Sequence, residues 1–286
     1  MTSPLASGAE VVVPPSDTAS LTSEGSGPEY RQRRHDAGPA DRTPSWLPTW
    51  VILPSQCPPT RSASGRSCAW SSKEAVSRPV PTLLYHFTHI SNLPSIRAQG
   101  LACDSEAQDA LLRVEAGKPS IKEQRRRKAV SAAPHGCVAD YVPFYYGTRS
   151  PMMFVIGKGQ VETYQEGLDP LVYLVTSVER LLELGHSLVY TDGNATTHVT
   201  RFVNELTELD RLVDWPLIKA KYWANTPEDG DRMRRRAAEC LARGPVPWHA
   251  FTDIAVRSAA RKAEVEASVT HPVATASVRV QPDWYY

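Results

Sequence analysis

The stretch from Asp140 to Ile156, Asp-Tyr-Val-Pro-Phe-Tyr-Tyr-Gly-Thr-Arg-Ser-Pro-Met-Met-Phe-Val-Ile, constrains the fold more than any other part of the chain. Both halves are rich in aromatic and apolar residues, and a Gly-Thr-Arg-Ser-Pro segment separates them. The pattern predicts a β-hairpin over residues 141–156. Arg149 would then be fixed in the turn between two apolar strands, where it is well placed to bind an anion. An ordinary exposed turn arginine is the alternative interpretation.

Composition excludes several classes of protein. The chain has 286 residues, 41% of them hydrophobic, and a net charge of +1, so any basic surface must be local, at 125–128 and 232–236. The five cysteines are scattered without a C-x-x-C pair, which argues against a disulfide framework or zinc ribbon and favours a reducing, cytoplasmic location. No apolar run reaches the roughly 18–20 residues of a membrane helix, and the N-terminus lacks a secretory signal pattern, so no membrane association is expected.

The chain divides into two regions by composition. Residues 1–79 are rich in proline and serine and lack sustained periodicity, which predicts a low-complexity, disordered extension with one apolar island at 45–53. Residues 80–286 are predicted to form one α+β domain. Strands are expected at 81–89, 170–176, 188–191, 238–242, 253–256 and from 277 onward. Helices are expected at 90–100 (capped by Ser91 or Asn92), 107–128, 178–185, 201–212, 214–223 and 257–269, and a polar loop at 224–236.

The run His86-Phe-Thr-His89 is the first group of residues that could bind a ligand. On a strand, His86 and Thr88 share one face and His89 points the other way. A zinc site needs three or four ligands, and no partner histidine or cysteine stands at ligand spacing, so no metal is expected. Histidine and threonine on one face can instead hydrogen-bond a ribose or a carboxamide, although a structural histidine is the alternative.

The sequence lacks the common phosphate-binding and nucleophile motifs. It has no G-x-G-x-x-G, no Walker A pattern and no G-x-S-x-G elbow. The acidic residue of greatest interest is Glu239, which follows a string of arginines and begins an apolar run that would partly bury it. A carboxylate on a helix, paired with Arg235 or Arg243, is the ordinary alternative.

Taken together, these segments resemble the DarT family of bacterial toxins, which ADP-ribosylate thymidine in single-stranded DNA with NAD+ as donor. The resemblance covers about residues 82–286. Two positions differ from the family's usual pattern: Cys240 stands where a large apolar residue is common, and Ser95 where glycine is frequent. The segments that carry the resemblance are 85–93, 141–154, 191–195, 237–242 with 246–248, and 284–286.

The resemblance implies an ADP-ribosyltransferase-like fold, a split mixed β-sheet core with surrounding helices, that binds NAD+ without a metal. His86, Phe87 and Thr88 would hold the nicotinamide and its ribose, while Ser95 and Leu101 would line the rest of the cofactor site. Residues 121–151 would fold over NAD+, and 192–239 would form the loop that receives the target base.

Two residues would carry the chemistry that the resemblance implies. Glu239 would stabilise the positive charge that develops at the ribose when nicotinamide departs. Arg149 would bind the cofactor and is assigned the removal of the thymine proton. Because arginine stays protonated in almost any setting, a clamp on the cofactor pyrophosphate is the other role considered for it. Both roles predict that Arg149→Ala is inactive.

The resemblance also implies partners. Single-stranded DNA would need cations for its phosphates and aromatic faces for its bases, which the arginine clusters and exposed tyrosines or tryptophans could supply; solvated helix faces are the alternative for the clusters. A macrodomain antitoxin would remove the modification. Two other functions remain open at this point: an ADP-ribosyltransferase acting on RNA or protein, and a catalytically silent nucleic-acid-binding module.

Overall fold

The computed structural model describes residues 77–107, 113–269 and 276–286. Except for residues 77–79, the predicted N-terminal extension lies outside the described residues, and so does its apolar island at 45–53.

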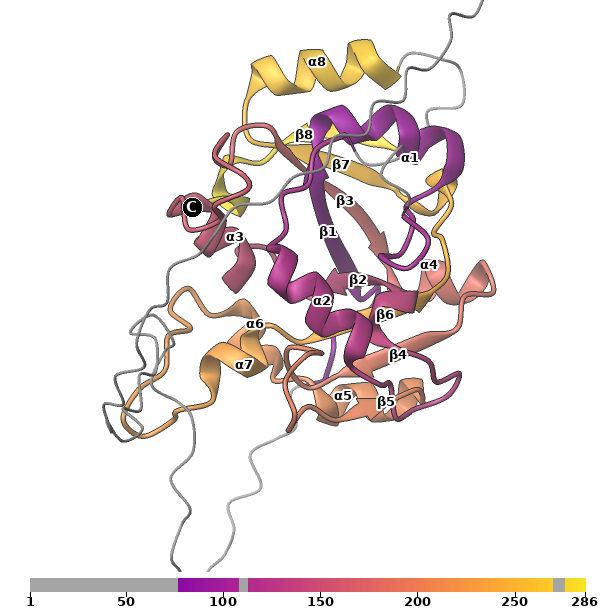
Figure 1. Cartoon of the computed structure of the whole chain (residues 1–286), viewed down its shortest axis with the longest axis vertical. Coiled ribbons are helices and arrows are strands. Elements are labelled where there is room, and N and C mark those ends of the chain that lie inside the picture. The colour runs from indigo at the N-terminus through magenta and orange to yellow at the C-terminus, as the bar shows by residue number, and fades with distance from the viewer. Residues whose placement is uncertain (1–76, 108–112, 270–275) are drawn as a thin grey trace, which may run out of the picture. The chain divides into compact units, whose positions relative to one another are not determined.

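A single mixed β-sheet organises the described chain (Figure 1). Neighbouring strands are antiparallel except β7 and β8, which are parallel. This sheet, together with the helices around it, confirms the predicted α+β class. In spatial order the strands are β5 (Phe202–Val203), β4 (Leu188–Thr191), β6 (Glu239–Arg243), β2 (Tyr141–Tyr145), β1 (Leu83–His89), β3 (Leu171–Ser177), β7 (Asp253–Val256) and β8 (Ser277–Val280).

The sheet is split where β1 meets β2. These two strands pair in register at one position, Tyr85 with Tyr145, whereas β1 pairs with β3 at seven positions and β2 with β6 at five. Beyond that pair, Pro143 has no N–H to offer the neighbouring strand. Its carbonyl oxygen instead lies 2.8 Å from Nδ1 of His86. The sheet therefore consists of two four-stranded halves that diverge from the Tyr85–Tyr145 pair.

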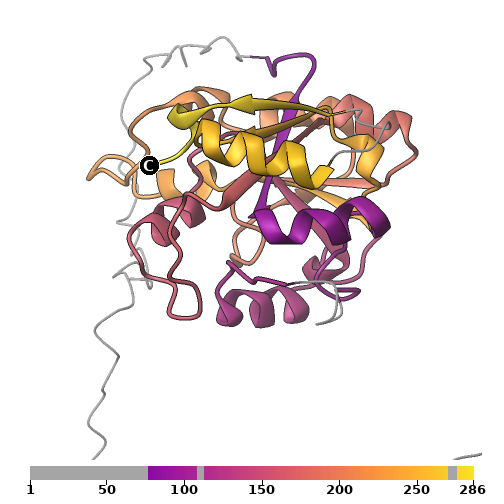
Figure 2. The same ribbon diagram turned by 90° about the horizontal axis from the view of Figure 1, so that it is seen from above.

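Short helices surround the sheet, and α1, α2 and α8 lie on the same side of it (Figures 1 and 2). Single 3₁₀ turns precede α1, β2 and β7, among other places. The helices are α1 (Leu93–Gln99), α2 (Pro119–Arg127), α3 (Pro151–Gly157), α4 (Val178–Glu183), α5 (Leu209–Leu212), α6 (Trp215–Lys219), α7 (Arg232–Arg236) and α8 (Ala259–Val269).

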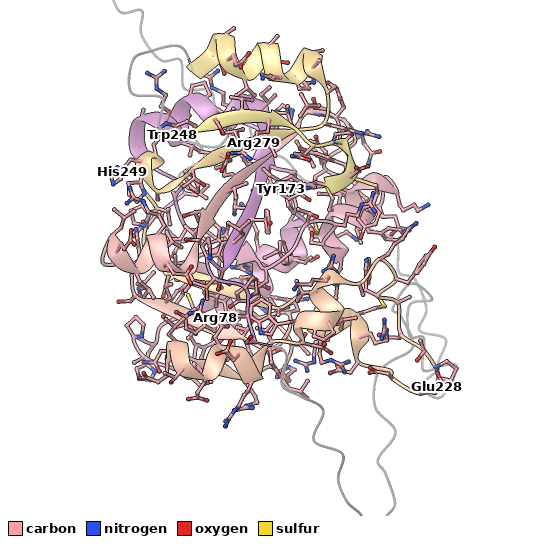
Figure 3. The ribbon with its side chains drawn as sticks, turned by 180° about the vertical axis from the view of Figure 1, so that it is seen from behind. Arg78, Tyr173, Glu228, Trp248, His249 and Arg279 are labelled. Carbon is pink, nitrogen blue, oxygen red and sulfur yellow. The ribbon has the colours of Figure 1, made fainter. Side chains whose placement is uncertain are left out.

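Strand β3 runs through the centre of the core and is buried along its whole length. Alternate side chains enter two different hydrophobic clusters: Val172 and Leu174 on one face, Leu171, Tyr173 and Val175 on the other. Tyr173 is visible from behind the molecule in Figure 3. Burial of each large apolar side chain stabilises the fold by about 1.5–3 kcal/mol. The prediction of a strand that is apolar on both faces is confirmed.

The predicted hairpin over 141–156 is wrong in its second half, which is helix α3. Ser150 caps this helix by accepting a hydrogen bond from the Met153 N–H at 3.2 Å, and Pro151 occupies the first turn. A serine cap followed by proline is a strong helix start, and here it overrides the strand preference of the apolar residues that follow. Met153 and Ile156, three residues apart, are the helix's buried contacts.

Three other element predictions need correction. The helix expected at 107–128 spans only Pro119–Arg127 among the described residues, because proline sets its start. The segment 201–212 forms strand β5, a 3₁₀ turn and the short helix α5 rather than one helix, and the end of the expected loop 224–236 is helix α7. Asn92 does precede α1, but its side chain makes no capping bond.

Candidate active site

A cavity of about 380 Å³ opens where the two halves of the sheet diverge. Its walls come from β1, α1, the segment after α1, α2 and β2. Gly100 ends α1 with φ +85°, a conformation suited to glycine, and Leu101 then bonds through its backbone to Val246. All five residues predicted to bind only the cofactor line this one cavity: His86, Phe87, Thr88, Ser95 and Leu101.

His86 presents a neutral ring to the cavity. Burial lowers its pKa from the ordinary value, opposed by the hydrogen bond to the Pro143 carbonyl and the charge of Asp104 and assisted by that of Arg125. A carbonyl oxygen can only accept, so Nδ1 carries the proton and Nε2 is left as an acceptor. Nε2 of His86 is therefore suited to receive a hydroxyl or amide hydrogen from a ligand.

Thr88 is fixed by a buried asparagine. The Asn92 Nδ2 donates to the Thr88 hydroxyl oxygen at 3.1 Å and to the Val114 carbonyl at 2.8 Å. The Asn92 Oδ1 accepts from the backbone N–H groups of Arg113 and Val114. This network leaves the Thr88 hydroxyl hydrogen free to be donated and ties β1 to the segment that leads into α2.

Two aromatic rings face each other across the split. Phe87 of β1 and Tyr145 of β2 have ring centroids 6.4 Å apart and planes inclined by 8°. Burial raises the pKa of Tyr145, and the nearby Glu239 carboxylate raises it further, so its phenol stays neutral. Tyr145 lies directly opposite Glu239 in the register of β2 and β6.

Glu239 begins β6 and is only 2% exposed. Its Oε1 accepts a hydrogen bond from the Ala195 N–H at 3.1 Å, and its Oε2 lies 3.0 Å from Nη1 of Arg125. The expected burial is confirmed, but the helical environment and the pairing with Arg235 or Arg243 are not what the structure contains. Glu239 lies behind Arg125, which itself lines the cavity.

Arg125 is the residue that sequence reasoning missed. It had been grouped with the exposed basic cluster 125–128, yet it is 7% exposed and lies between Glu239 and Asp104. Burial opposes its charge, but the two carboxylates more than offset this and raise its pKa above the ordinary value. Its Nη2 is buried and makes no hydrogen bond within the described part of the chain. A buried cation with an unused donor beside a cavity is complementary to an anionic or carbonyl-rich ligand.

Arg149 is placed differently from the prediction. It follows β2 with φ +54°, a left-handed conformation that is strained for a residue other than glycine. Its Nε donates to the Tyr285 carbonyl at 2.9 Å, its guanidinium lies 5.8 Å from the centre of the Tyr286 ring, and its own carbonyl accepts from the Tyr286 hydroxyl. Neither Arg149 nor Glu239 is among the described residues that line the cavity. The structure thus brings Glu239 together with Arg125, while Arg149 holds the C-terminal aromatic residues.

The second arginine cluster, 232–236, is engaged within the fold. Arg234 pairs with Asp192 and Asp231, and Arg235 with Asp214 and Asp229. Arg236 is buried and donates to the carbonyls of Ile218 and Thr148. These cations brace the loop 192–239 from inside, so they are not the free phosphate contacts that the sequence suggested. Glu228, in the same loop, lies far out at the periphery (Figure 3).

Among residues 77–107, 113–269 and 276–286, no three or more histidine, cysteine, aspartate or glutamate side chains are grouped to hold a metal ion. No helix in this part of the chain is long and apolar enough to span a membrane.

The site therefore combines hydrogen-bonding groups for a sugar or amide, an aromatic pair, and a buried carboxylate–guanidinium pair. A profile of the family described as ssDNA thymidine ADP-ribosyltransferase, DarT, matches residues 85–286. The chain belongs to the DarT family. A DNA ADP-ribosyl transferase from Thermus sp. (strain 2.9) is 37% identical over 210 residues, which cover 73% of this chain and 98% of the relative.

Solved structures of Thermus sp. 2.9 DarT confirm the predicted ADP-ribosyltransferase-like fold of this family member. The complex with ADP-ribosylated ssDNA aligns with a TM-score of 0.67 at 34% identity and covers 73% of this chain and 99% of that one. The complex with NAD+ aligns with a TM-score of 0.64 at 34% identity, covering 73% and 100%. A more distant DarT relative, from Thermosipho africanus, is a DNA ADP-ribosyl transferase–DNA ADP-ribosyl glycohydrolase fusion protein, 26% identical over 55% of this chain and 38% of its own length.

Proposed function

We propose that residues 80–286 form a mono-ADP-ribosyltransferase that transfers ADP-ribose from NAD+ to thymidine in single-stranded DNA. The observation that carries this proposal is the buried Arg125–Glu239 pair, 3.0 Å apart, beside a cavity that Arg125 lines together with His86 and Thr88. The NAD+ and ADP-ribosylated ssDNA in the Thermus DarT structures supply the donor and acceptor classes.

Each end of the donor has a complementary group in this cavity. The His86 Nε2 acceptor and the Thr88 hydroxyl donor suit the nicotinamide carboxamide and its ribose. The Phe87 and Tyr145 rings offer an apolar contact to the flat nicotinamide. Ser95 and Leu101 also line this cavity and would contact the rest of the ligand.

Glu239 acts electrostatically during transfer. Departure of nicotinamide leaves positive charge at the anomeric carbon, and a buried carboxylate stabilises that charge more in the transition state than in the ground state. The Ala195 N–H and Arg125 hold the two carboxylate oxygens in fixed directions.

Arg125 is proposed to act on the thymine, in the step for which the resemblance names Arg149. The attacking thymine ring nitrogen must lose its proton, and the resulting negative charge spreads onto the two neighbouring carbonyl oxygens. A fixed guanidinium with a free Nη2 donor favours that anion. Because its two carboxylate neighbours keep Arg125 charged, the role proposed for it is stabilisation of the anion, while the thymine proton passes to solvent water.

The acceptor strand has a candidate surface beside the loop 192–239. Tyr222 is 77% exposed, with the Lys221 ammonium 5.6 Å from the centre of its ring, and Trp223 follows it in the sequence. The Phe154 ring packs edge to face against the rings of Trp223 and Tyr286. Aromatic faces with nearby cations are suited to the bases and phosphates of a single strand. We call these four residues, 154, 222, 223 and 286, the aromatic patch.

The partner implied by this activity is an enzyme that reverses it. The fused glycohydrolase of the Thermosipho relative supports a separate macrodomain antitoxin for this chain, which would make the chain the toxin of a toxin–antitoxin pair. Adding such a glycohydrolase to the labelled product should release the label.

The direct test incubates the full chain with labelled NAD+ and, separately, single-stranded DNA, duplex DNA, RNA and a protein mixture. We expect label on thymine-containing single strands, lost in Glu239→Gln and kept in Glu183→Gln, a matched change at an exposed carboxylate on α4. Label on RNA or protein alone would overturn the acceptor, and DNA binding without transfer would favour a silent module.

A further inference from the structure

The turn Thr191–Ala195 carries the backbone group that holds Glu239. The Ala195 N–H donates to Oε1 at 3.1 Å. The Thr191 hydroxyl accepts from the Glu239 N–H at 2.8 Å and lies 2.7 Å from the Gly193 carbonyl. Thr191 and Ala195 are fully buried. The turn thus fixes Glu239 at both its backbone and its carboxylate.

One ion pair fixes this turn in place. Nη1 and Nη2 of Arg234 lie 3.0 and 3.3 Å from Oδ1 and Oδ2 of Asp192, a two-pronged contact between side chains that are 15% and 18% exposed. The Arg234 carbonyl also accepts from the Asn194 N–H at 3.2 Å. Arg234 therefore contacts the turn through both its side chain and its backbone. We call the Asp192–Arg234 pair the clasp.

The clasp leaves no space for a side chain at Gly193. A Cβ at this position would lie 2.4 Å from Nη1 and 2.9 Å from Cγ of Arg234. Contacts this short require one of the groups to move, and Arg234 is held on its other side by Asp231 at 2.8 Å. The absence of a side chain at Gly193 lets the guanidinium lie directly against the turn.

We propose that Asp192 and Arg234 are positioning residues that set the direction of the Glu239 carboxylate through the Ala195 N–H. This inference rests on the proposed function, in which Glu239 acts on the ribose. Arg125 constrains Oε2, and the turn constrains Oε1, so a loosened turn leaves the carboxylate free to rotate about Arg125. Because catalysis needs a productive geometry, such freedom lowers kcat while the distant cavity wall still binds NAD+.

Helix α8 offers a control outside the loop 192–239. Nε of Arg261, on α8, lies 2.8 Å from Oδ2 of Asp169. Neither residue belongs to the loop or is among the described residues that line the cavity. Asp192→Asn and Asp169→Asn therefore each remove one carboxylate charge from an arginine ion pair.

The test measures transfer kinetics for both variants in the full chain. We expect Asp192→Asn to lower kcat about 10- to 100-fold, the range expected when a catalytic group is misplaced by up to about 1 Å, with KM for NAD+ within about twofold. Gly193→Ala, which displaces the guanidinium without removing either charge, should give the same split. Asp169→Asn should leave kcat and KM within about twofold.

A second readout does not depend on activity. Hydrogen exchange of a peptide covering 190–196, followed by mass spectrometry, should be faster in Asp192→Asn than in wild type and unchanged in Asp169→Asn. If both variants alter exchange and kcat alike, the clasp is merely structural and the inference is overturned; it is overturned too if Asp192→Asn changes neither. If wild type transfers nothing, the proposed function fails, and the exchange comparison alone decides whether the clasp positions the turn.

Discussion

Nη1 of Arg125 lies 3.0 Å from Oε2 of Glu239, although 114 residues separate the two in the chain. The contact joins α2 to β6 of the sheet (Figure 1). Both side chains are buried, and an unpaired charge in such a place would be costly. Each charge of the pair therefore avoids the cost that it would incur alone.

Removing one member of this pair should separate catalysis from stability. Glu239→Gln is expected to lower the transfer rate by about 100-fold or more, the loss typical of a removed electrostatic group, with the dissociation constant for NAD+ within a few-fold. Arg125→Met should also abolish transfer and, by stranding the buried carboxylate, cost about 3–5 kcal/mol of unfolding free energy. Transfer assays, NAD+ titration calorimetry and urea unfolding check these outcomes.

The double variant Arg125→Met with Glu239→Gln is the matched control. It removes both charges, so it should recover much of the stability lost in Arg125→Met while remaining inactive. The assignment of these residues as a buried charge pair would be contradicted if the double variant regained activity. It would also be contradicted if the double variant lost more unfolding free energy than the two single variants lose together.

Arg149 should matter for folding more than for the cofactor. Its side chain binds the Tyr285 carbonyl and the Tyr286 ring, so Arg149→Ala is expected to lower the melting temperature while the dissociation constant for NAD+ stays within about threefold. Arg149→Gly loses the same contacts but relieves the left-handed strain, so it should be more stable than the alanine variant by about 1 kcal/mol. A large loss of NAD+ affinity in both variants would restore Arg149 to the cofactor site.

Because His86 is buried, we expect the free energy of unfolding to depend on pH. Burial lowers its pKa below 6.5, so below pH 6.5 the unfolded chain takes up a proton that the folded chain resists. The stability that depends on a neutral His86 is thus complete above pH 6.5 and declines as the pH falls toward the lowered pKa. Urea unfolding at pH 7.5 and 5.5 should show a larger acid loss in wild type than in His86→Gln; equal losses would mean that His86 is not held neutral.

The aromatic patch predicts how the acceptor strand is held. Tyr222→Ala should weaken binding of a thymine-containing single strand about 5- to 150-fold, which corresponds to the loss of one stacked base, without changing NAD+ affinity. Leu182→Ala, at an exposed apolar residue on α4, serves as the control. Equal DNA affinity in wild type and Tyr222→Ala, measured by fluorescence anisotropy, would exclude Tyr222 from the DNA-binding surface.

The cavity wall could be predicted from the sequence because it is local. His86, Phe87 and Thr88 are consecutive on one strand, and the helix that carries Ser95 follows within a few residues. The other residues of the site are brought together only by tertiary contacts. Arg125 stands in a polar, basic run that reads as solvated, and only the packing of α2 over β6 reveals its burial beside Glu239.

The prediction from the sequence was wrong where a short capping signal opposed a longer strand-like run. The cap at Ser150 with Pro151 decided the state of the apolar residues after it, and their strand preference did not. The arginines of α7 look like a DNA-binding cluster because their aspartate partners are scattered: two shortly precede the helix, at 229 and 231, and two stand farther back, at 192 and 214. The buried Asn92 was the one available signal for a polar network near Thr88, since asparagine rarely stands between apolar helix positions without a partner.

The strand order has a consequence for synthesis. Strand β6 is sixth in the chain but lies between β4 and β2, so it is the piece that joins the β4–β5 edge to the rest of the sheet. A nascent chain that has not yet released β6 from the ribosome lacks both the carboxylate and the strand that would place the Thr191–Ala195 turn beside it. Arg125 therefore gains its carboxylate partner only once β6 has been made, and a chain that ends before β6 has the cavity-lining residues His86, Phe87 and Thr88 but not Glu239.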